Sequence, residues 1–542
     1  MALYLNQNND KFNEYKSARI FIDKSNLIKE CNSLFGTSDK YMCITRPRRF
    51  GKTMALSMLN AYYSKGCDSA SLFDKLNIAS DNSYLKHLNK HNVIWIDMAS
   101  VYADTIDKNT FVEKLASEIM DDLKHAYPDI LTNSFDTLRK CFNELNSKLN
   151  ERFIFLIDEW DVIFREEEYN YKLCDDYIMF LRGLFKSSDV SACIDLVYMT
   201  GILPIRRYST QSTLNMFTEY NMIRPRGFES FLGFTEEEVK DLCKKYNRDF
   251  NKISQWYNGY KLGDVSIYNP KSVVEAVLSG EYGDYWTQTS AIEAVTNYMN
   301  YDNGALKDII ARMLSGDKVS VNVSRFDNDL TKVNSADSAL TVLIHLGYLG
   351  FIKGEELGYG YCYIPNYEIR QEFVNAILEL DWKEIYNPIS NSKKLYEETL
   401  KGNVEFINKT LDQNHKDLAG PFNKNKEDIL GIIVEISYYN AKQFYNIKKE
   451  DTSILGRSDL SFIPYDNNHI PFIVELKINS SAEEAIEQIK QKKYFNSLGD
   501  YHGKVLLLGI SYDDNTLKHS SRVEIIEMYL IGVTVMLLLL VF

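Results

Sequence analysis

The residues RPRRFGKT, at positions 46–53, join an apolar run to an amphipathic one, and this junction restricts the fold more than any other feature of the sequence. KYMCIT (40–45) predicts a buried strand before it, and the residues from Gly51 onward predict a helix after it. A Gly-Lys-Thr that opens a helix directly after a strand is typical of a loop that binds nucleotide phosphates. The usual loop has a further Gly where this chain has Arg46, so the motif alone is a weak signal.

A second motif supplies what such a loop needs beside it. Backbone N–H groups at Gly51, the amine of Lys52 and the hydroxyl of Thr53 would face the phosphates. In FIFLIDEWD, Asp158 ends an apolar strand and would bind Mg²⁺, while Glu159 would orient the attacking water. ATP and Mg²⁺ are therefore the expected ligands of the N-terminal part.

Several of these residues also have a simpler interpretation. Asp158 alone fits an acid that starts a helix. Thr200, at a strand end, would sense the γ-phosphate, but a hydroxyl satisfied within the protein explains it as well. Arg46, Arg48 and Arg49 add positive charge beside the phosphates, or else form a solvated basic loop.

The order of the apolar runs predicts an α/β fold for the first 230 residues. Further strands are expected at 93–98, 152–158 and 193–201, and helices at 108–126 and 134–150. Such an alternation favours a three-layer domain with a parallel sheet.

The chain then becomes mainly helical, from residue 233 to about 400. Thr235 and Glu238 form a capping box that predicts a helix start. Further on, ALTVLIHLGYLGFI followed by GYCYIPN predicts a helix and a small hairpin, as in a winged-helix module. The polar stretch 410–427 has the composition of a linker, and the elements beyond it are expected in the order α-β-β-α-β.

The C-terminal part carries a second group of charged residues. GRSDL places Asp459 on one strand, and VELK places Glu475 and Lys477 on the same face of the next. Two carboxylates would bind Mg²⁺, and the lysine would steer or deprotonate a water that attacks a phosphodiester. A lone Glu-x-Lys is usually a solvated ion pair, but PFIVELKI is apolar enough for a central strand, where unpaired charges are costly.

Taken together, these motifs resemble a known family, the AAA-ATPase-like proteins fused to a PD-(D/E)XK nuclease domain. The resemblance runs from about residue 17 to 515 and is carried by RPRRFGKT, LIDEWD, TGI, GFTEEEV, WYNGY, YNPKSV, YW..TS and IPN.EIR. The family loop itself reads Arg-Pro-Arg-Arg-Phe-Gly-Lys, so Arg46 is a family trait. The chain departs at Ser458, where the family has an apolar residue, and the acids are intact.

The resemblance implies an ATP-binding module at 1–230, a helical lid and winged-helix-like region at 231–405, a nuclease-like α/β domain at 406–520 and a hydrophobic tail at 521–542. It assigns to the nucleotide site the whole loop, namely Arg46, Pro47, Arg48, Arg49, Phe50, Gly51, Lys52 and Thr53. It also adds Gln488 and Tyr494 to the nuclease motif, with an upstream helix acid as a further metal ligand. Glu427 and Glu435 both qualify for that position, and Glu427 is preferred because the family acid opens this helix.

Two functions follow from these motifs. The first is an ATP-binding, ATP-hydrolysing protein with a Mg²⁺-dependent nuclease domain that cleaves nucleic acid, with DNA favoured. The second is a nucleotide-dependent switch or scaffold whose nuclease fold only binds partners. The basic segment RPRGF (224–228) would touch phosphates in the first, and a homo-oligomer is compatible with both.

The bulk composition restricts the setting. The 542 residues carry a net charge of −13, which argues against a chain coated by nucleic acid and leaves room for a local basic groove. The eight cysteines are scattered without a CxxC pair, and the N-terminus lacks a signal-peptide pattern, so we expect reduced cytoplasm, or the nucleus in a eukaryote. The uncharged run after Glu527 is shorter than the roughly 20 residues of a spanning helix. A buried end, a tail anchor and a gene-boundary artefact all remain explanations of it.

Overall fold

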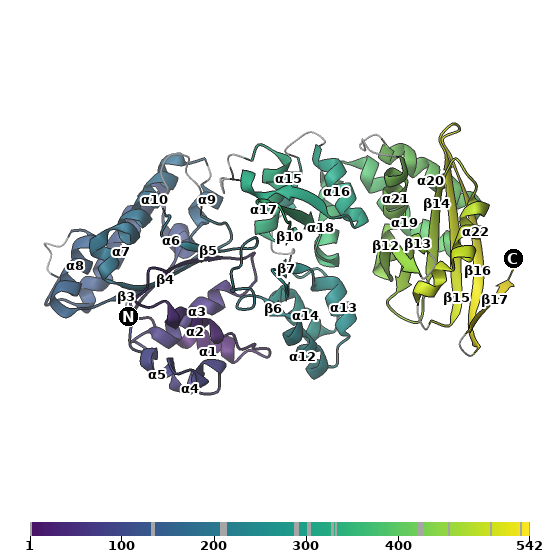
Figure 1. Cartoon of the computed structure of the whole chain (residues 1–542). Helices are drawn as coiled ribbons and strands as arrows, with labels where there is room; N and C mark the ends of the chain where they lie inside the picture. The colour runs from purple at the N-terminus through teal and green to yellow at the C-terminus, as the bar shows by residue number, and fades with distance from the viewer. Residues whose placement is uncertain are drawn as a thin grey trace. The chain divides into compact units, whose positions relative to one another are not determined.

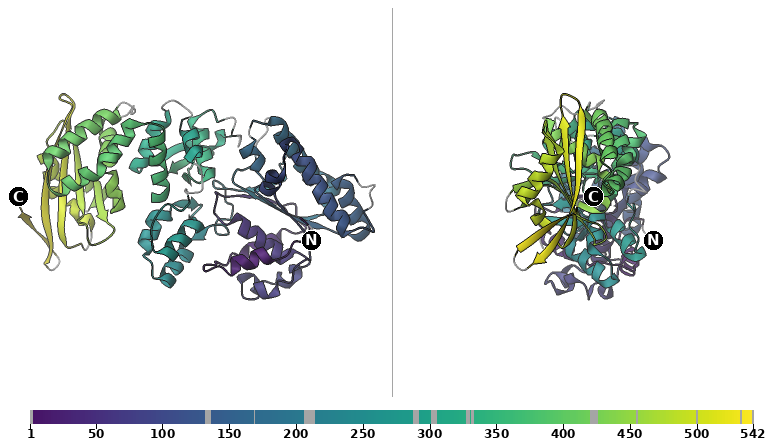
Figure 2. Two further views of the ribbon diagram at one scale, coloured as in Figure 1. Left: turned by 180° about the vertical axis from the view of Figure 1, so that it is seen from behind. Right: turned by 90° about the vertical axis from the view of Figure 1, so that its right-hand side faces the viewer.

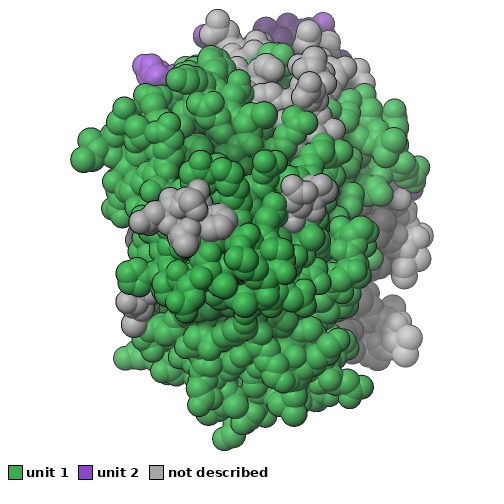
Figure 3. All heavy atoms as spheres, turned by 90° about the vertical axis from the view of Figure 1, so that its left-hand side faces the viewer, with its two compact units in different colours: residues 1–301, 320–370 green, residues 302–319, 371–542 purple. Residues whose placement is uncertain are grey.

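The computed structural model (Figures 1 and 2) forms two compact units, which are residues 1–301 with 320–370 and residues 302–319 with 371–542. Figure 3 draws them in different colours. The finer domain boundaries expected at 230, 405 and 520 stay a prediction. The residues that the structure describes are 3–131, 136–167, 169–205, 214–286, 292–300, 305–326, 330, 333–419, 426–453, 456–498, 501–531 and 534–540.

A five-stranded parallel sheet forms the centre of the first unit. The strand order is β2-β3-β4-β1-β5, with bounds Asn92–Asp97, Phe153–Asp158, Ile194–Gly201, Tyr41–Thr45 and Thr218–Tyr220. The four longer strands confirm the sequence prediction to within a residue, because their apolar runs are buried on both faces as in most parallel sheets. The parallel direction brings all their carboxyl ends to one edge.

Helices cover both faces of this sheet, which gives the three layers that the sequence predicts (Figure 1). Alternate residues of each strand enter two separate cores: Tyr41 and Cys43 lie in one, Met42 and Ile44 in the other. One face carries α6 (Met98–Asp104), α7 (Phe111–Ala126), α8 (Leu138–Leu149), α9 (Val162–Glu166), α10 (Tyr171–Lys186) and α11 (Ser188–Ala192). The other carries α1 (Asp10–Lys16), α2 (Asn26–Ser33), α3 (Lys52–Tyr63), α4 (Ala70–Phe73) and α5 (Tyr84–His87).

Helices and two small sheets make up the rest of the first unit. Thr235 and Glu238 form the predicted capping box at the start of α12. The predicted helix and hairpin are α17, β10 and β11. The helices are α12 (Glu236–Tyr246), α13 (Phe250–Tyr257), α14 (Pro270–Ser279), α15 (Ile292–Met299), α17 (Ala336–Leu346) and α18 (Tyr367–Glu379), of which α18 continues into the second unit from Gln371 onward. One sheet consists of β6 (Phe234–Thr235), β8 (Val265–Tyr268) and β7 (Tyr260–Leu262), and the other of β10 (Gly350–Lys353), β11 (Tyr359–Tyr363) and β9 (Val319–Asn322).

The second unit is a six-stranded mixed sheet with helices on both faces. Only β14 and β15 pair in parallel, and the other described pairs are antiparallel. The strands, in sheet order, are β12 (Tyr445–Ser453), β13 (Gly456–Pro464), β14 (Phe472–Ile478), β15 (Gly503–Asp513), β16 (Lys518–Ile531) and β17 (Thr534–Leu540). The helices are α16 (Ala305–Ser315), α19 (Lys383–Leu400), α20 (Val404–Ala419), α21 (Lys426–Ser437) and α22 (Ala482–Lys492).

Two sequence predictions for this unit need correction, and the structure adds one observation on the apolar tail. The linker expected at 410–427 is wrong over its first part, because residues up to 419 belong to α20, whose apolar face packs on the sheet. The order α-β-β-α-β omits β12 and β16, whose sequences contain many polar residues and therefore give a weak strand signal. The apolar tail contains a strand, β17, that pairs with β16, and among the described helices none has the length and apolar character needed to cross a bilayer.

Gly259 occupies a position where the backbone allows no other residue. Its φ is +119°, and a Cβ there would lie 2.0 Å from the carbonyl oxygen of Pro365. We expect Gly259→Ala to destabilise the protein by about 2 kcal/mol or more, through the clash and the strained backbone. The denaturant midpoint of unfolding measures this change.

Gly183→Ala is the matched control. Gly183 lies within α10, and a Cβ there meets nothing within 4 Å. Alanine should stabilise that helix by about 0.5–1 kcal/mol. Equal effects of the two substitutions would contradict the close approach of Gly259 to Pro365.

Candidate functional sites

The phosphate-loop motif lies between β1 and α3, at the sheet edge where β3 and β4 also end. Gly51 caps α3 with φ +87°, in the left-handed region that favours glycine. The first N–H groups of a helix have no partner within the helix, and its dipole favours anions at this end. The backbone therefore offers an anion site at the residues that the sequence indicates.

Four of the predicted side chains come together here. The Lys52 Nζ donates to the carbonyl oxygens of Arg46 and Pro47, both at 3.1 Å, and lies 3.9 Å from Oε1 of Glu159. The Thr53 hydroxyl donates to Oδ2 of Asp158 at 2.7 Å. Lys52 is thus held by neutral carbonyls that phosphate oxygens could replace.

Burial controls the charges of this group. It raises the pKa of Asp158 to about 6, an effect that Thr53 opposes by hydrogen bonding to the carboxylate. Burial also lowers the pKa of Lys52, and the carboxylates of Glu159 and Asp158 work against it. A buried carboxylate hydrogen-bonded to a helix-start hydroxyl is the donor set that Mg²⁺ uses in nucleotide sites, so these residues fit the cation.

Glu159 is restrained by a residue that the sequence did not point out. Arg165 on α9 donates through Nη2 to Oε2 of Glu159 and through Nε to Oδ2 of Asp161 at 3.1 Å. The same Asp161 oxygen accepts from the backbone N–H groups of Ile202 and Leu203. The final Asp of LIDEWD therefore ties α9 to the chain after β4, while Arg165 sets the position of Glu159.

Arg46 does not lie where the sequence led us to expect. Its guanidinium group is fully buried and donates to the carbonyl oxygens of Thr45 at 2.8 Å and of Tyr220 and Phe228 at 3.0 Å. Burial lowers its pKa to about 10. The expected charge beside the phosphates is therefore wrong for Arg46, whereas Arg48 and Arg49 have exposed side chains.

The remaining loop residues pack against the later part of the first unit. The Phe50 ring meets that of Tyr260 edge-on at 5.4 Å. A Cβ on Gly347 would lie 2.6 Å from Cβ of Pro47, so the chain there passes directly over the proline. Phe50 and Pro47 thus shape the loop by packing rather than by polar contact with a ligand.

Thr200 has the simpler of its two interpretations in this structure. Its hydroxyl is buried and donates to the carbonyl oxygen of Ile44 at 2.8 Å, the residue opposite it on β1. That bond directs the hydroxyl into the sheet, so a contact with the γ-phosphate would require it to break.

Glu368, within the motif IPN.EIR, has a buried carboxylate that is linked to the phosphate loop. Oε1 of Glu368 accepts from the backbone N–H groups of Tyr285 and Trp286 at 2.7 Å and from the Ser272 hydroxyl at 3.0 Å. The Trp286 indole N–H in turn donates to the carbonyl oxygen of Arg48 at 3.0 Å. The motifs YW and IPN.EIR are thus explained as the support of the phosphate loop.

The predicted nuclease residues converge in the second unit. Asp459 lies on β13 and accepts through Oδ2 from the backbone N–H of Leu476 on β14 at 2.7 Å. On β14, the Lys477 Nζ lies 3.0 Å from Oε1 of Glu475. From α22, the Gln488 amide donates both to Glu475 and to the Tyr494 hydroxyl.

Glu475 has the properties of a cation ligand. Burial, and then the nearby charge of Asp459, raise its pKa to about 7. Its Oε2 is buried and has no hydrogen-bond partner among the described residues. An unsatisfied buried carboxylate oxygen is costly, and a divalent cation beside a second carboxylate would satisfy it, so the pair fits Mg²⁺.

The third acid is less well defined. Glu427 lies on α21, but its side chain is outside the described residues. Glu435, on the same helix, is buried and pairs with Lys449 at 2.8 Å, and Lys449 also contacts Asp317. Over the described residues no group of three His, Cys, Asp or Glu side chains is placed to hold a metal.

Glu368 allows a test of the electrostatics behind the phosphate loop. Burial raises its pKa from 4.5 to about 7, so the folded state binds the extra proton between these values. Stability should therefore fall as the pH rises through this window. Gln keeps the accepting oxygen and removes the charge, so Glu368→Gln should be more stable than the wild type at pH 8, by on the order of 2–3 kcal/mol.

The advantage of Glu368→Gln should disappear at about pH 3.5, a full unit below the unfolded-state pKa, where the wild-type group is largely protonated in both states. Glu379→Gln, at an exposed position of the same helix, is the control and should show no such trend. Denaturant unfolding at the two pH values measures the difference in stability between each variant and the wild type. A loss of stability that is equal at both would refute a buried, titrating Glu368.

Comparisons with known proteins agree with the two parts of this fold. Residues 10–210 match the AAA-ATPase-like family, described as predicted AAA-ATPase, and residues 431–522 match the PD-(D/E)XK nuclease superfamily. An uncharacterized protein in the vnfD 5′ region of Azotobacter chroococcum mcd 1 is 21% identical over 489 residues, which cover 86% of this chain and 89% of the relative. The ORC2 protein of Aeropyrum pernix (ADPNP-ADP complexes) aligns over 67% of this chain and 97% of its own, with 13% identity and a TM-score of 0.28, which is a weak likeness. The chain therefore combines an N-terminal region that matches the AAA-ATPase-like family with a C-terminal region that matches the PD-(D/E)XK nuclease superfamily.

Proposed function

We propose that this chain is a nucleotide-regulated nuclease, which binds and hydrolyses ATP in its first unit and cleaves phosphodiester bonds of nucleic acid, with DNA favoured, in its second. The observation that carries the proposal is the buried Oε2 of Glu475, which has no hydrogen-bond partner among the residues described and lies beside Asp459 and Lys477. A folded protein rarely leaves such an atom without a partner unless a ligand supplies it.

The proposed cleavage uses residues of β13, β14 and α22. Asp459 and Glu475 would hold Mg²⁺, which when bound supplies a Lewis acid for the phosphodiester. Lys477, whose amine already lies at Oε1 of Glu475, would orient or deprotonate the attacking water and stabilise the developing charge. Gln488 holds Glu475 in place and is itself bonded to Tyr494.

In the first unit, the α3 N-terminus and Lys52 would bind the β- and γ-phosphates. Thr53 and Asp158 would hold the accompanying Mg²⁺. Glu159 would orient the attacking water. For this its carboxylate would have to break its ion pairs with Arg165 and Lys52. Hydrolysis would then depend on how easily these ion pairs open.

A second candidate is a nucleotide-dependent switch whose nuclease fold binds partners without cleaving them. Two contacts favour it, because Lys477 and Gln488 both donate to Oε1 of Glu475 and so satisfy that oxygen without a substrate. The two candidates differ only in the chemistry of the second unit.

The discriminating experiment incubates the purified full chain with fluorescent DNA, Mg²⁺ and ATP. Lys477→Ala should reduce cleavage by about 100-fold or more, because it removes the group that stabilises developing charge. ATP binding should persist in that variant. Lys52→Ala should instead abolish ATP binding and hydrolysis while leaving the metal-dependent chemistry of the second unit intact.

Two exposed lysines serve as charge-matched controls: Lys504→Ala for the second unit and Lys75→Ala for the first. Neither should change cleavage or ATP hydrolysis. ATP hydrolysis without cleavage of DNA or RNA under Mg²⁺ or Mn²⁺ would refute the nuclease and favour the switch. Cleavage that survives Lys477→Ala would remove the chemistry from this cluster.

A further inference from the structure

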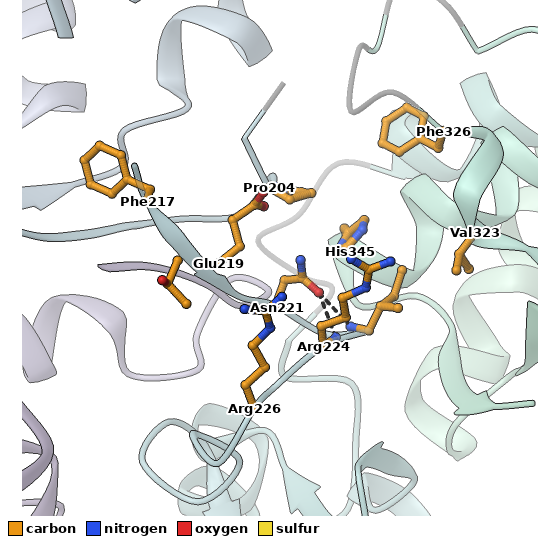
Figure 4. A pocket seen from close by; sticks show the side chains of 11 residues that line it. Pro204, Phe217, Glu219, Asn221, Arg224, Arg226, Val323, Phe326 and His345 are labelled. Atoms are coloured by element: carbon orange, nitrogen blue, oxygen red, sulfur yellow. Dashed lines mark hydrogen bonds between the residues drawn. The ribbon is translucent and has the colours of Figure 1, made fainter. Parts of the chain in front are cut away.

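A polar cavity of ≈ 170 Å³ in the first unit is lined by Arg224 and Arg226 of the basic segment RPRGF (224–228) and contains no residue of the phosphate loop. One wall is β5 with the turn that follows it, and the other is formed by η4 (Val323–Arg325) and α17. Figure 4 shows that Arg224 extends toward the buried His345, whereas Arg226 extends toward Asn221. Two guanidinium groups therefore line one cavity from different directions.

Both arginines are available for a ligand. Their side chains are exposed, and within the described part of the chain neither guanidinium group has a hydrogen-bond or ion-pair partner. Glu219 is the acidic residue among those that line the cavity, and its carboxylate accepts from the backbone N–H of Ile205 at 3.1 Å. The cavity therefore has an excess of positive charge on its described walls.

The turn that carries the arginines has a fixed backbone. Oδ1 of Asn221 accepts from the N–H groups of Ile223 and Arg224, and the Asn221 N–H donates to the carbonyl oxygen of Arg224. Arg226 has φ +51°, in the left-handed region that few non-glycine residues adopt. Preorganised donors lose less entropy on binding than flexible ones.

Both ends of the turn are anchored to the phosphate loop. The buried guanidinium of Arg46 donates to the carbonyl oxygens of Tyr220 and Phe228, which lie directly before and after the segment with the two arginines. Arg46 thus holds both the phosphate loop and the turn that lines the cavity, although no residue of the loop lines the cavity itself.

We propose that Arg224 and Arg226 form a second phosphate site, which binds the sugar–phosphate backbone of a nucleic acid. Arginine forks match phosphate oxygens, and guanidinium groups that have no partner within the described ranges are the donors that such a backbone requires. Their divergent directions suit successive phosphates of one strand better than a single free phosphate. The proposal rests on the proposed function, because the nuclease domain is what makes nucleic acid the expected polyanion.

The test measures binding of a fluorescein-labelled 20-base-pair DNA duplex to the full chain in EDTA, so that cleavage does not interfere. Arg224→Ala/Arg226→Ala should weaken binding by about tenfold or more and reduce the slope of log affinity against log salt by about 1.8, or 0.9 per lost phosphate contact. Arg139→Ala/Arg226→Ala should reduce the slope by about 0.9, half as much, because only Arg226 of this pair lines the cavity. Arg139 is exposed on α8, remote in sequence from the cavity. The single variant Arg139→Ala is the charge-matched control.

The proposal would be overturned if Arg224→Ala/Arg226→Ala bound DNA with the same affinity and the same salt dependence as Arg139→Ala. So would equal, arginine-dependent binding of a poly-glutamate chain, since the site would then recognise acidic protein. Arg224→Lys/Arg226→Lys should keep most of the salt slope, which guards against a folding defect. Because binding is read without metal, a wild type that binds DNA through these arginines but never cleaves it would contradict the nuclease and leave this site standing.

Discussion

The buried guanidinium of Arg46 is the contact on which the first unit depends most. It donates to three backbone carbonyls, of Thr45, Tyr220 and Phe228, and its Nε has no partner among the described residues. Hydrogen bonds from a charged group contribute about 1.5–3 kcal/mol each, and their loss would leave buried carbonyls unsatisfied. Arg46 replaces the first glycine of the usual phosphate loop and gives the loop an anchor that glycine cannot provide.

The same loop is also held from its other side. The indole N–H of Trp286 bonds to the Arg48 carbonyl, Phe50 packs on Tyr260, and Pro47 lies under Gly347. Residues far apart in the chain therefore fix the shape of one turn at the end of β1. If a nucleotide binds at this turn as proposed, a movement of the turn would change these contacts with the later part of the first unit.

Local patterns predicted much of this architecture, and long-range contacts account for what they missed. The strand ending at Thr45 and the capping box of Thr235 are encoded in a few neighbouring residues. The role of Arg46 could not be predicted, because two of its acceptors lie 174 and 182 residues away. The convergence of Glu475 and Lys477 follows from strand alternation, whereas the bond from Gln488 to Glu475 depends on how α22 packs against the sheet.

The most direct test of the account is hydrogen–deuterium exchange of the segment 220–228 in the full chain. Arg46→Met keeps a long side chain and removes the three hydrogen bonds, so exchange at the Asn221, Arg224 and Phe228 amides should rise. Arg48→Met, at an exposed position of the same loop, should leave it unchanged. Wild-type protection of this segment in Arg46→Met, together with a loss of nucleotide binding, would show that Arg46 serves the ligand and would contradict the structural role assigned to it.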